Sequence, residues 1–111
     1  MNKLLFTMTL ALMSSSVMAA FNGPSAPAVS NVEQAKSAAD DSFVVLTGHI
    51  VQSLGGELYL FKDASGEIEV EIDHENWMGQ KVSPQDTVTI RGEVDSEWTT
   101  TQIDVDMIQK I

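Results

Sequence analysis

The sequence predicts an all-β domain, a small five-stranded barrel with a short helix before the first strand and a helical turn between the third and fourth. Its 111 residues fit one domain, since domains typically contain about 100–150 residues. From Phe43 onward, apolar residues recur with a period of two, in five short segments separated by turn-forming residues. The chain has no cysteine, which excludes disulfides and thiol nucleophiles, so the core alone must stabilise the domain.

Residues 1–19 have the three-part order of a secretory signal peptide, and we predict that they are removed on export. A single Lys precedes an apolar run at residues 4–13, which is about half as long as a membrane span. Cleavage after Ala19 is favoured over cleavage after Ala20, because the second would put the larger Met18 three residues before the cut. Cleavage would leave 92 residues with a formal net charge of −11.

The next segment leads into the domain proper. Residues 20–30 are rich in Ala and Pro, and we expect a flexible tail there. Residues 30–33, Ser-Asn-Val-Glu, have the spacing of a capping box and predict a helix over 31–39. Two acidic residues at 40–41 should end this helix, because negative charge is unfavourable at a helix C-terminus. The barrel domain is expected to occupy 31–111.

Turn residues divide the rest of the chain into strands. The five expected strands are 43–51, 57–63, 67–73, 87–94 and 100–110, and a helical turn is expected at 74–79. Five strands with a helical insertion between the third and fourth have the element order of the oligonucleotide/oligosaccharide-binding (OB) fold. We therefore predict a five-stranded OB-fold barrel.

The charge of the chain opposes the usual ligand of this fold. Sixteen acidic residues against six basic ones give a formal net charge of −10. Nucleic-acid binding depends on Lys and Arg side chains that neutralise phosphate, and an anionic membrane surface attracts the same side chains. We therefore expect neither a nucleic-acid partner nor direct membrane insertion after signal cleavage.

The second and third strands have two possible registers. A two-residue loop would place Leu60 opposite Glu69 and mix apolar and charged residues on one face. A three-residue loop at 64–66 would instead pair Asp63 with Glu67 and separate the two faces. We predict the three-residue loop.

That register predicts an outer face that carries Tyr59, Phe61, Glu69 and Glu71. Carboxylates beside exposed aromatic rings can bind a cationic or sugar-containing ligand through charge and stacking. The simpler interpretation is a solvated strand face without a ligand. The ligand-binding surface is a hypothesis that also rests on analogy with other OB barrels.

Two histidines are the remaining candidates for metal chemistry. His74 lies between Asp73 and Glu75, and this trio is an alternative site for zinc or a related ion. Neighbours in a strand point to opposite faces, so the three converge only if the chain turns there. His49 is expected to have a structural role in the first strand.

Catalytic motifs are not indicated. The sequence contains no G-x-S-x-G motif, and a barrel this small offers no obvious cleft for paired carboxylates. We therefore expect no enzyme and no cofactor. Core packing is favoured for both Trp77 and Trp98, because Trp is usually largely buried, and an exposed contact is the alternative for Trp98.

Blocks of spaced residues along the whole domain form a further pattern. They are Ala35-Lys36-Ser37, Asp40-Asp41, Val44-x-Leu46-x-Gly48-x-Ile50-Val51, Leu58-Tyr59-x-Phe61-Lys62-Asp63-Ala64-Ser65-Gly66, Ile72-Asp73-x-x-x-Trp77-x-Gly79, Asp86-Thr87-Val88, Ile90-x-Gly92-Glu93-Val94-Asp95, Trp98 and Ile103-Asp104-Val105. With this pattern the chain resembles the bacterial OB-fold (BOF, YgiW/YdeI-like) family of periplasmic stress-tolerance proteins. The resemblance implies an OB barrel with an N-terminal helix, a periplasmic location and a non-enzymatic role, and it carries over no catalytic residue.

The sequence thus predicts a periplasmic binding or adaptor protein that supports envelope stress tolerance, against peroxide, metals, acid or cationic peptides. Its expected partner is a cationic ligand or an envelope protein, bound at the acidic, aromatic-bearing face. The alternative is a divalent-metal-binding periplasmic protein.

Overall fold

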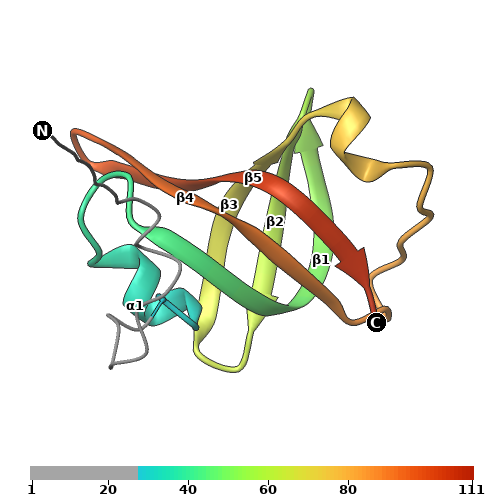
Figure 1. Cartoon of the computed structure of the whole chain (residues 1–111), viewed down its shortest axis with the longest axis horizontal. Coiled ribbons are helices and arrows are strands. Elements are labelled where there is room, and N and C mark those ends of the chain that lie inside the picture. Colours follow the sequence, from blue (N-terminus) through green and yellow to red (C-terminus); the bar gives the residue numbers. More distant parts are fainter. Residues whose placement is uncertain (1–27) are drawn as a thin grey trace, which may run out of the picture.

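The computed structural model describes residues 28–111. The predicted signal peptide, its cleavage position and residues 20–27 of the predicted tail lie outside these residues, while Val29, expected in the tail, forms a bridge with Val44 of the first strand. The elements, drawn in Figure 1, are α1 (Val32–Lys36), β1 (Phe43–Gly55), β2 (Leu58–Asp63), β3 (Gly66–Ile72), the 3-10 helix η3 (His74–Trp77), β4 (Val88–Glu97) and β5 (Thr100–Lys110).

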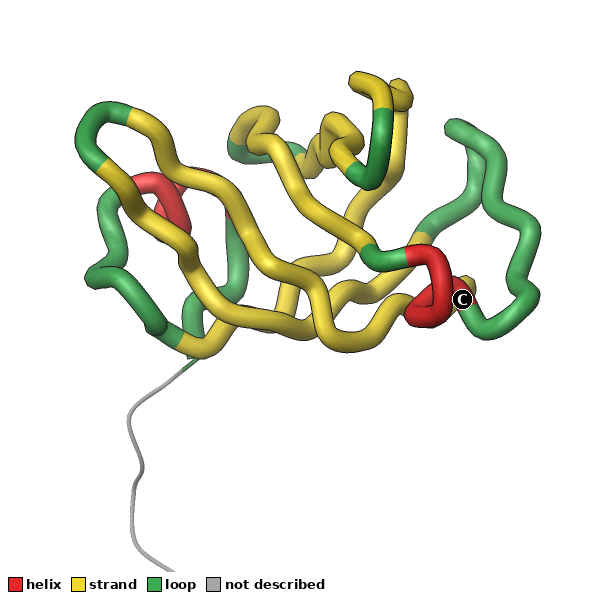
Figure 2. The backbone as a smooth tube through the Cα atoms, turned by 90° about the horizontal axis from the view of Figure 1, so that it is seen from above, coloured by secondary structure: helices red, strands yellow, loops and turns green. Residues whose placement is uncertain are grey.

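The five strands close into a barrel in the order β1-β2-β3-β5-β4, which confirms the predicted fold class. Neighbouring strands are antiparallel except for β3 and β5, which pair in parallel over four residues of each strand. Figure 2 shows the strands surrounding the interior, with η3 and a long loop at one end. Within residues 28–111, no helix is long and apolar enough to cross a membrane.

Strand β1 belongs to two strand pairs and changes partner in its middle. Its first part, up to Gly48, pairs with β4, and its second part, from His49, pairs with β2. A Cβ atom on Gly48 would lie 2.3 Å from the carbonyl oxygen of Lys62. Only glycine allows this close approach of two backbones, so the residue type permits the strand to pass from one partner to the other.

The core fills the barrel interior with aliphatic side chains and one aromatic ring, that of Phe61. Helix α1 closes one end through Val32 and Ala35, which are fully buried. Two side chains of the β2–β3 turn hold the start of this helix. Asp63 Oδ2 accepts a hydrogen bond from the Val32 N–H at 3.0 Å, and Ser65 Oγ accepts one from the Glu33 N–H at 3.0 Å.

Helix α1 is shorter than the predicted segment 31–39. Its N-cap is Asn31, whose side chain accepts a hydrogen bond from the Gln34 N–H at 2.8 Å, and not Ser30. The residues after Lys36 leave the helix and form turns that lead into β1. The barrel stabilises this helix in addition to its own capping, because an isolated helix of about one and a half turns is unstable in water.

The predicted register of β2 and β3 is wrong. The loop has two residues, so Asp63 pairs with Gly66, Leu60 with Glu69 and Phe61 with Ile68. Asp63 is the physical reason, since its Oδ1 accepts hydrogen bonds from the N–H groups of Ser65 (2.8 Å) and Gly66 (3.2 Å). This side-chain-to-backbone turn fixes the short loop, for which Asp first and Gly fourth are typical residues.

The β4–β5 hairpin is longer than predicted. Strand β4 continues through residues 95–97, which were expected to form the turn, and Trp98 and Thr99 make the tight turn instead. The prediction that Trp98 packs into the core is wrong, because its side chain is 101% exposed. Its φ of 53° is also unusual for a bulky residue.

Candidate functional site

The outer surface of four strands forms an acidic face. Residues that are paired across neighbouring strands project to the same side of a sheet, so the registers define two rows. The first row is Leu60, Glu69, Gln102 and Asp95, and the second is Leu58, Glu71, Asp104 and Glu93. None of these eight side chains is buried. Five carboxylates, two leucines and one amide therefore share this surface, with no basic residue in either row.

The carboxylates of this face affect one another. Partial burial raises the pKa of Glu71, and the charges of Asp104 and Asp73 raise it further. Partial burial raises the pKa of Asp104 as well, together with the charges of Asp106 and Asp73. The Gln102 amide donates a hydrogen bond to Glu71 Oε1 at 3.3 Å and supplies one neutral partner. The acidic face therefore has a concentrated negative potential, which a bound cation would relieve.

The structure separates the four residues that the sequence analysis placed on one face. Glu69 and Glu71 lie on the acidic face, but Phe61 is in the core with 0% exposure. Tyr59 is half-buried on the inner side and packs edge-to-face on Trp77, with ring centroids 5.3 Å apart. The short β2–β3 loop causes this exchange, because a shift of one residue moves every side chain to the other face. Two leucines take the outer positions that had been predicted for the aromatic rings.

The predicted metal trio is not brought together as a group. Asp73 instead lies with Glu57 and Glu71, and the carboxylate oxygens of these three residues are within 4.8 Å of one another. His74 contributes its backbone N–H to Glu57 Oε2 at 3.0 Å. His49 has the expected structural contact, since its Nδ1 lies 2.9 Å from the backbone oxygen of Asp86. Oxygen ligands such as the trio of Glu57, Glu71 and Asp73 suit hard cations better than zinc.

Sequence analysis missed the contribution of β4 and β5 to the acidic face. Asp104 was named there only as one residue of the spaced family pattern. The alternation of β5 does place Asp104 outward, but its position beside Glu71 depends on the parallel pairing of β3 and β5, which local periodicity does not show. The turn residues Asp63 and Gly66 were the available signal for the correct register.

Comparison with known proteins agrees with the fold and with the spaced residue pattern. The family model described as "Bacterial OB fold (BOF) protein" matches residues 11–110. The chain belongs to the bacterial OB-fold (BOF) family. Protein YgiW of Escherichia coli K12 is 48% identical over 118 residues, covering 92% of this BOF chain and 91% of the relative.

Two further comparisons extend this result. The calcium-regulated OB-fold protein CarO of Pseudomonas aeruginosa PAO1 is 39% identical over 94 residues, covering 84% of this BOF chain and 81% of the relative. The solved structure of the hypothetical protein ygiW from E. coli superposes with a TM-score of 0.73 at 52% identity, covering 82% of this chain and 97% of that structure. The predicted family resemblance is confirmed, and none of these three relatives has the name of an enzyme.

Proposed function

We propose that this BOF protein is an exported, non-enzymatic binding module that supports envelope stress tolerance, and that its acidic face binds a cationic ligand or a basic segment of an envelope protein. One observation supports this most directly: five of the eight side chains in the two cross-strand rows are carboxylates, and none is basic. The predicted signal peptide supports a periplasmic location.

The composition of the acidic face favours a ligand that is both cationic and partly apolar. The carboxylates attract positive charge from a distance, which raises association rates at low ionic strength. Leu58 and Leu60 are half-buried and offer apolar contact area at the edge of the same rows. A Lys or Arg side chain has such a composition, since an apolar stem carries its charged end.

A binding measurement with pentalysine tests this function. The double variant Glu69→Gln/Glu71→Gln removes two charges from the acidic face. Exposed ion pairs contribute about 0.2–1 kcal/mol each, so the loss corresponds to an affinity about 2- to 30-fold lower. Calorimetric titration at low salt measures this change, and added salt should weaken binding to the native protein.

The matched control removes the same charge elsewhere. In Glu33→Gln/Asp41→Asn, both exposed carboxylates lie near the N-terminal end of the described fold and outside the two rows. The affinity of this variant for pentalysine should stay within about twofold of the native value, because surface charges away from the ligand contribute little to binding. Equal losses in the two double variants would show that net charge and not the acidic face determines binding.

A cellular experiment tests the physiological part of the proposal. A deletion strain that produces the Glu69→Gln/Glu71→Gln variant should survive peroxide, acid and cationic-peptide stress less well than one that produces the control variant. Cell fractionation should find both variants in the periplasm in equal amounts. Equal survival under all of these stresses would refute the role of the acidic face.

A second candidate function is the binding of a divalent cation, now centred on Glu57, Glu71 and Asp73. The convergence of their carboxylates within 4.8 Å favours it, and the name of the relative CarO describes a protein regulated by calcium. Calorimetric titration of the native protein and of Glu57→Gln with calcium, magnesium and zinc tests this candidate. Saturable heat with calcium that the substitution abolishes would support it, and no heat at micromolar protein would eliminate it.

A further inference from the structure

We propose that a groove along β1, beside the loop that precedes β4, binds a small organic anion with an apolar, ring-bearing body. The groove consists of two hollows of about 510 Å³ and about 330 Å³, which share Val51 and Pro84 in their lining. Each volume lies within the range of about 300–1,000 Å³ that is typical of small-molecule sites. This proposal does not depend on the proposed function.

The topology of β1 explains why the groove exists. Pairing between β1 and β4 ends at Gly48, while β1 continues to Gly55 with β2 as its partner. The chain between η3 and β4, residues 78–87, passes this part of β1 without joining the sheet. Figure 2 shows this segment as a wide loop beside the barrel. The space between the loop and β1 forms the groove.

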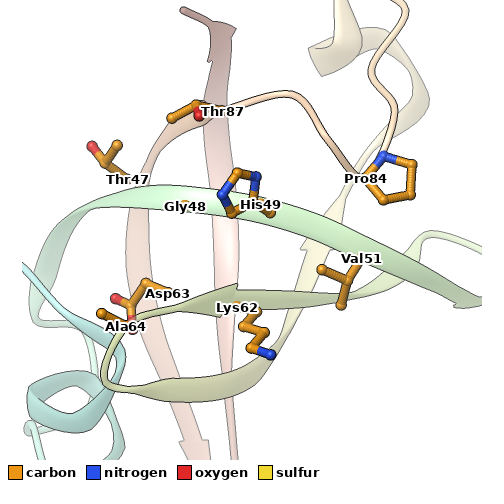
Figure 3. Close-up of a pocket in the computed structure, with 9 residues that line it drawn as sticks. All are labelled: Thr47, Gly48, His49, Val51, Lys62, Asp63, Ala64, Pro84 and Thr87. Carbon is orange, nitrogen blue, oxygen red and sulfur yellow. The ribbon is translucent and has the colours of Figure 1, made fainter.

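One end of the groove is polar and has a positive charge at its margin. Figure 3 shows His49 on β1 and Thr87 on the opposite side, whereas Lys62, on the neighbouring strand, extends its ammonium group away from both. His49 and Lys62 are register partners, so their side chains lie on the same face. Among residues 28–111 the ion pair within 4.0 Å joins Lys110 to Asp86 and does not include Lys62.

The orientation of His49 leaves one ring nitrogen for a ligand. Its Nδ1 lies 2.9 Å from the backbone oxygen of Asp86, and because a carbonyl oxygen only accepts, this nitrogen is the donor. Nε2 is therefore an acceptor in the neutral ring and donates a hydrogen bond to an anion only when the ring is protonated. Thr47 and Thr87 line the same hollow, and the Thr47 hydroxyl already lies 3.1 Å from that of Thr89.

The carboxylates near this end are already engaged. Asp63 accepts hydrogen bonds from the N-terminus of α1 and from its own turn, at Val32 and Ser65. Asp86 accepts from the Ser83 N–H at 2.8 Å and lies 3.5 Å from Lys110 Nζ. The remaining competitor is Glu67, the register partner of Lys62 on β3. The Lys62 ammonium group is therefore the positive charge beside this end of the groove, and its flexible side chain must turn toward His49 to meet a bound anion.

The other end of the groove is apolar and aromatic. Tyr59 and Trp77 stand edge-to-face there, with their rings at 75°, and Val82 of the loop lies beside them. His49 and Ser53, which line opposite ends, are four strand residues apart, or about 13 Å at 3.3 Å per residue. A ligand that uses both ends therefore needs an anionic group and a ring separated by several bonds.

A titration with 4-phenylbutyrate tests this site in the purified protein. Changes in the amide NMR signals should saturate and should map to Val51, Lys62 and Trp77. Butyrate lacks the ring and 4-phenylbutylamine reverses the charge, and both should bind about tenfold more weakly, as expected when one end of the groove loses its partner.

Two charge variants and a control complete the experiment. Lys62→Gln should weaken binding about tenfold, whereas Glu67→Gln should leave it equal or stronger. Lys81→Gln removes a loop charge that is not part of the groove lining and should have no effect. Equal binding of 4-phenylbutylamine, unchanged affinity of Lys62→Gln, no saturation by about 10 mM, or signal changes confined to the acidic face would each overturn the proposal. The pentalysine experiment would be unaffected by that failure.

Discussion

Phe61→Ala is the sharpest test of the strand register, because the register decides whether this ring lies in the core or on the surface. Phe61 is 0% exposed. Its ring packs closely against Gly48, because a Cβ atom on that glycine would lie only 2.9 Å from Phe61 Cζ. Removing a buried Phe side chain typically costs about 3–5 kcal/mol. The free energy of unfolding of a domain of this size is about 4–13 kcal/mol, so the variant loses a large fraction of its stability.

Urea denaturation followed by circular dichroism measures this loss, and thermal denaturation supports it. A loss of 3 kcal/mol should lower Tm by about 12–24 °C, at 4–8 °C per kcal/mol for a domain of 60–100 residues. Phe61→Leu keeps most of the apolar volume and should remain folded with a smaller loss. This variant keeps the test informative if Phe61→Ala does not fold.

Leu60→Ala is the matched control, since Leu60 is the next residue of the same strand and lies on the outer face. It is only half-buried and should cost about 1 kcal/mol, well below the value for a core position. A loss below about 0.5 kcal/mol in Phe61→Ala, with a larger loss in Leu60→Ala, would refute the observed register and restore the three-residue loop.

Four further changes test separate features of the fold. Gly48→Ala should cost about 3 kcal/mol or more in urea denaturation, because its new Cβ would meet the backbone oxygen of Lys62 at 2.3 Å, and an unchanged midpoint would contradict the close strand contact. Asp63→Asn should cost about 1–3 kcal/mol at pH 7. Hydrogen bonds lower the pKa of Asp63 below its ordinary 3.8 despite partial burial, so this contribution is present above pH 3.8 and should disappear as the pH falls through the folded-state pKa. Glu71 has the opposite sign: burial and neighbouring carboxylates raise its pKa above 4.5, so native stability declines as the pH rises through the folded-state pKa, and Glu71→Gln should be the more stable protein at pH 7 but not below pH 4.5. Trp98→Gly should be neutral or stabilising by up to about 1 kcal/mol, because the side chain is fully exposed and its φ is 53°, and a clear loss of stability would indicate a packing contact of the indole.

The order of helices and strands was predictable because it depends on local sequence patterns. Alternating apolar residues identified all five strands, and the turn-forming segments between them separated one strand from the next. The two errors of element length, in helix α1 and in the β4–β5 hairpin, arose where a few residues satisfied two local patterns. At the hairpin, residues 95–97 are turn-forming types that the pairing with β5 holds in a strand.

The candidate site was less predictable, because it depends on which face of each strand points outward. In a strand with apolar residues on both faces, such as β2, the sequence of the strand alone does not show which face points into the core. The preference for separated apolar and charged faces favoured the wrong loop. The hydrogen bonds from the Asp63 side chain to its own turn stabilise the two-residue loop more than that separation would have stabilised the longer one. The two leucines on the acidic face show that a small barrel tolerates partly exposed apolar residues.

The sequence by itself determined the OB-fold class, the family, the acidic character and the prediction of export, since each depends on composition, periodicity or spacing along the chain. Only the tertiary structure decided that Phe61 is in the core, that Trp98 is exposed and that Glu71 lies beside Asp104. It also decided where β1 loses β4 as a partner and a groove opens. These features depend on barrel closure, which pairs residues about 30 positions apart and sets one register for all five strands at once.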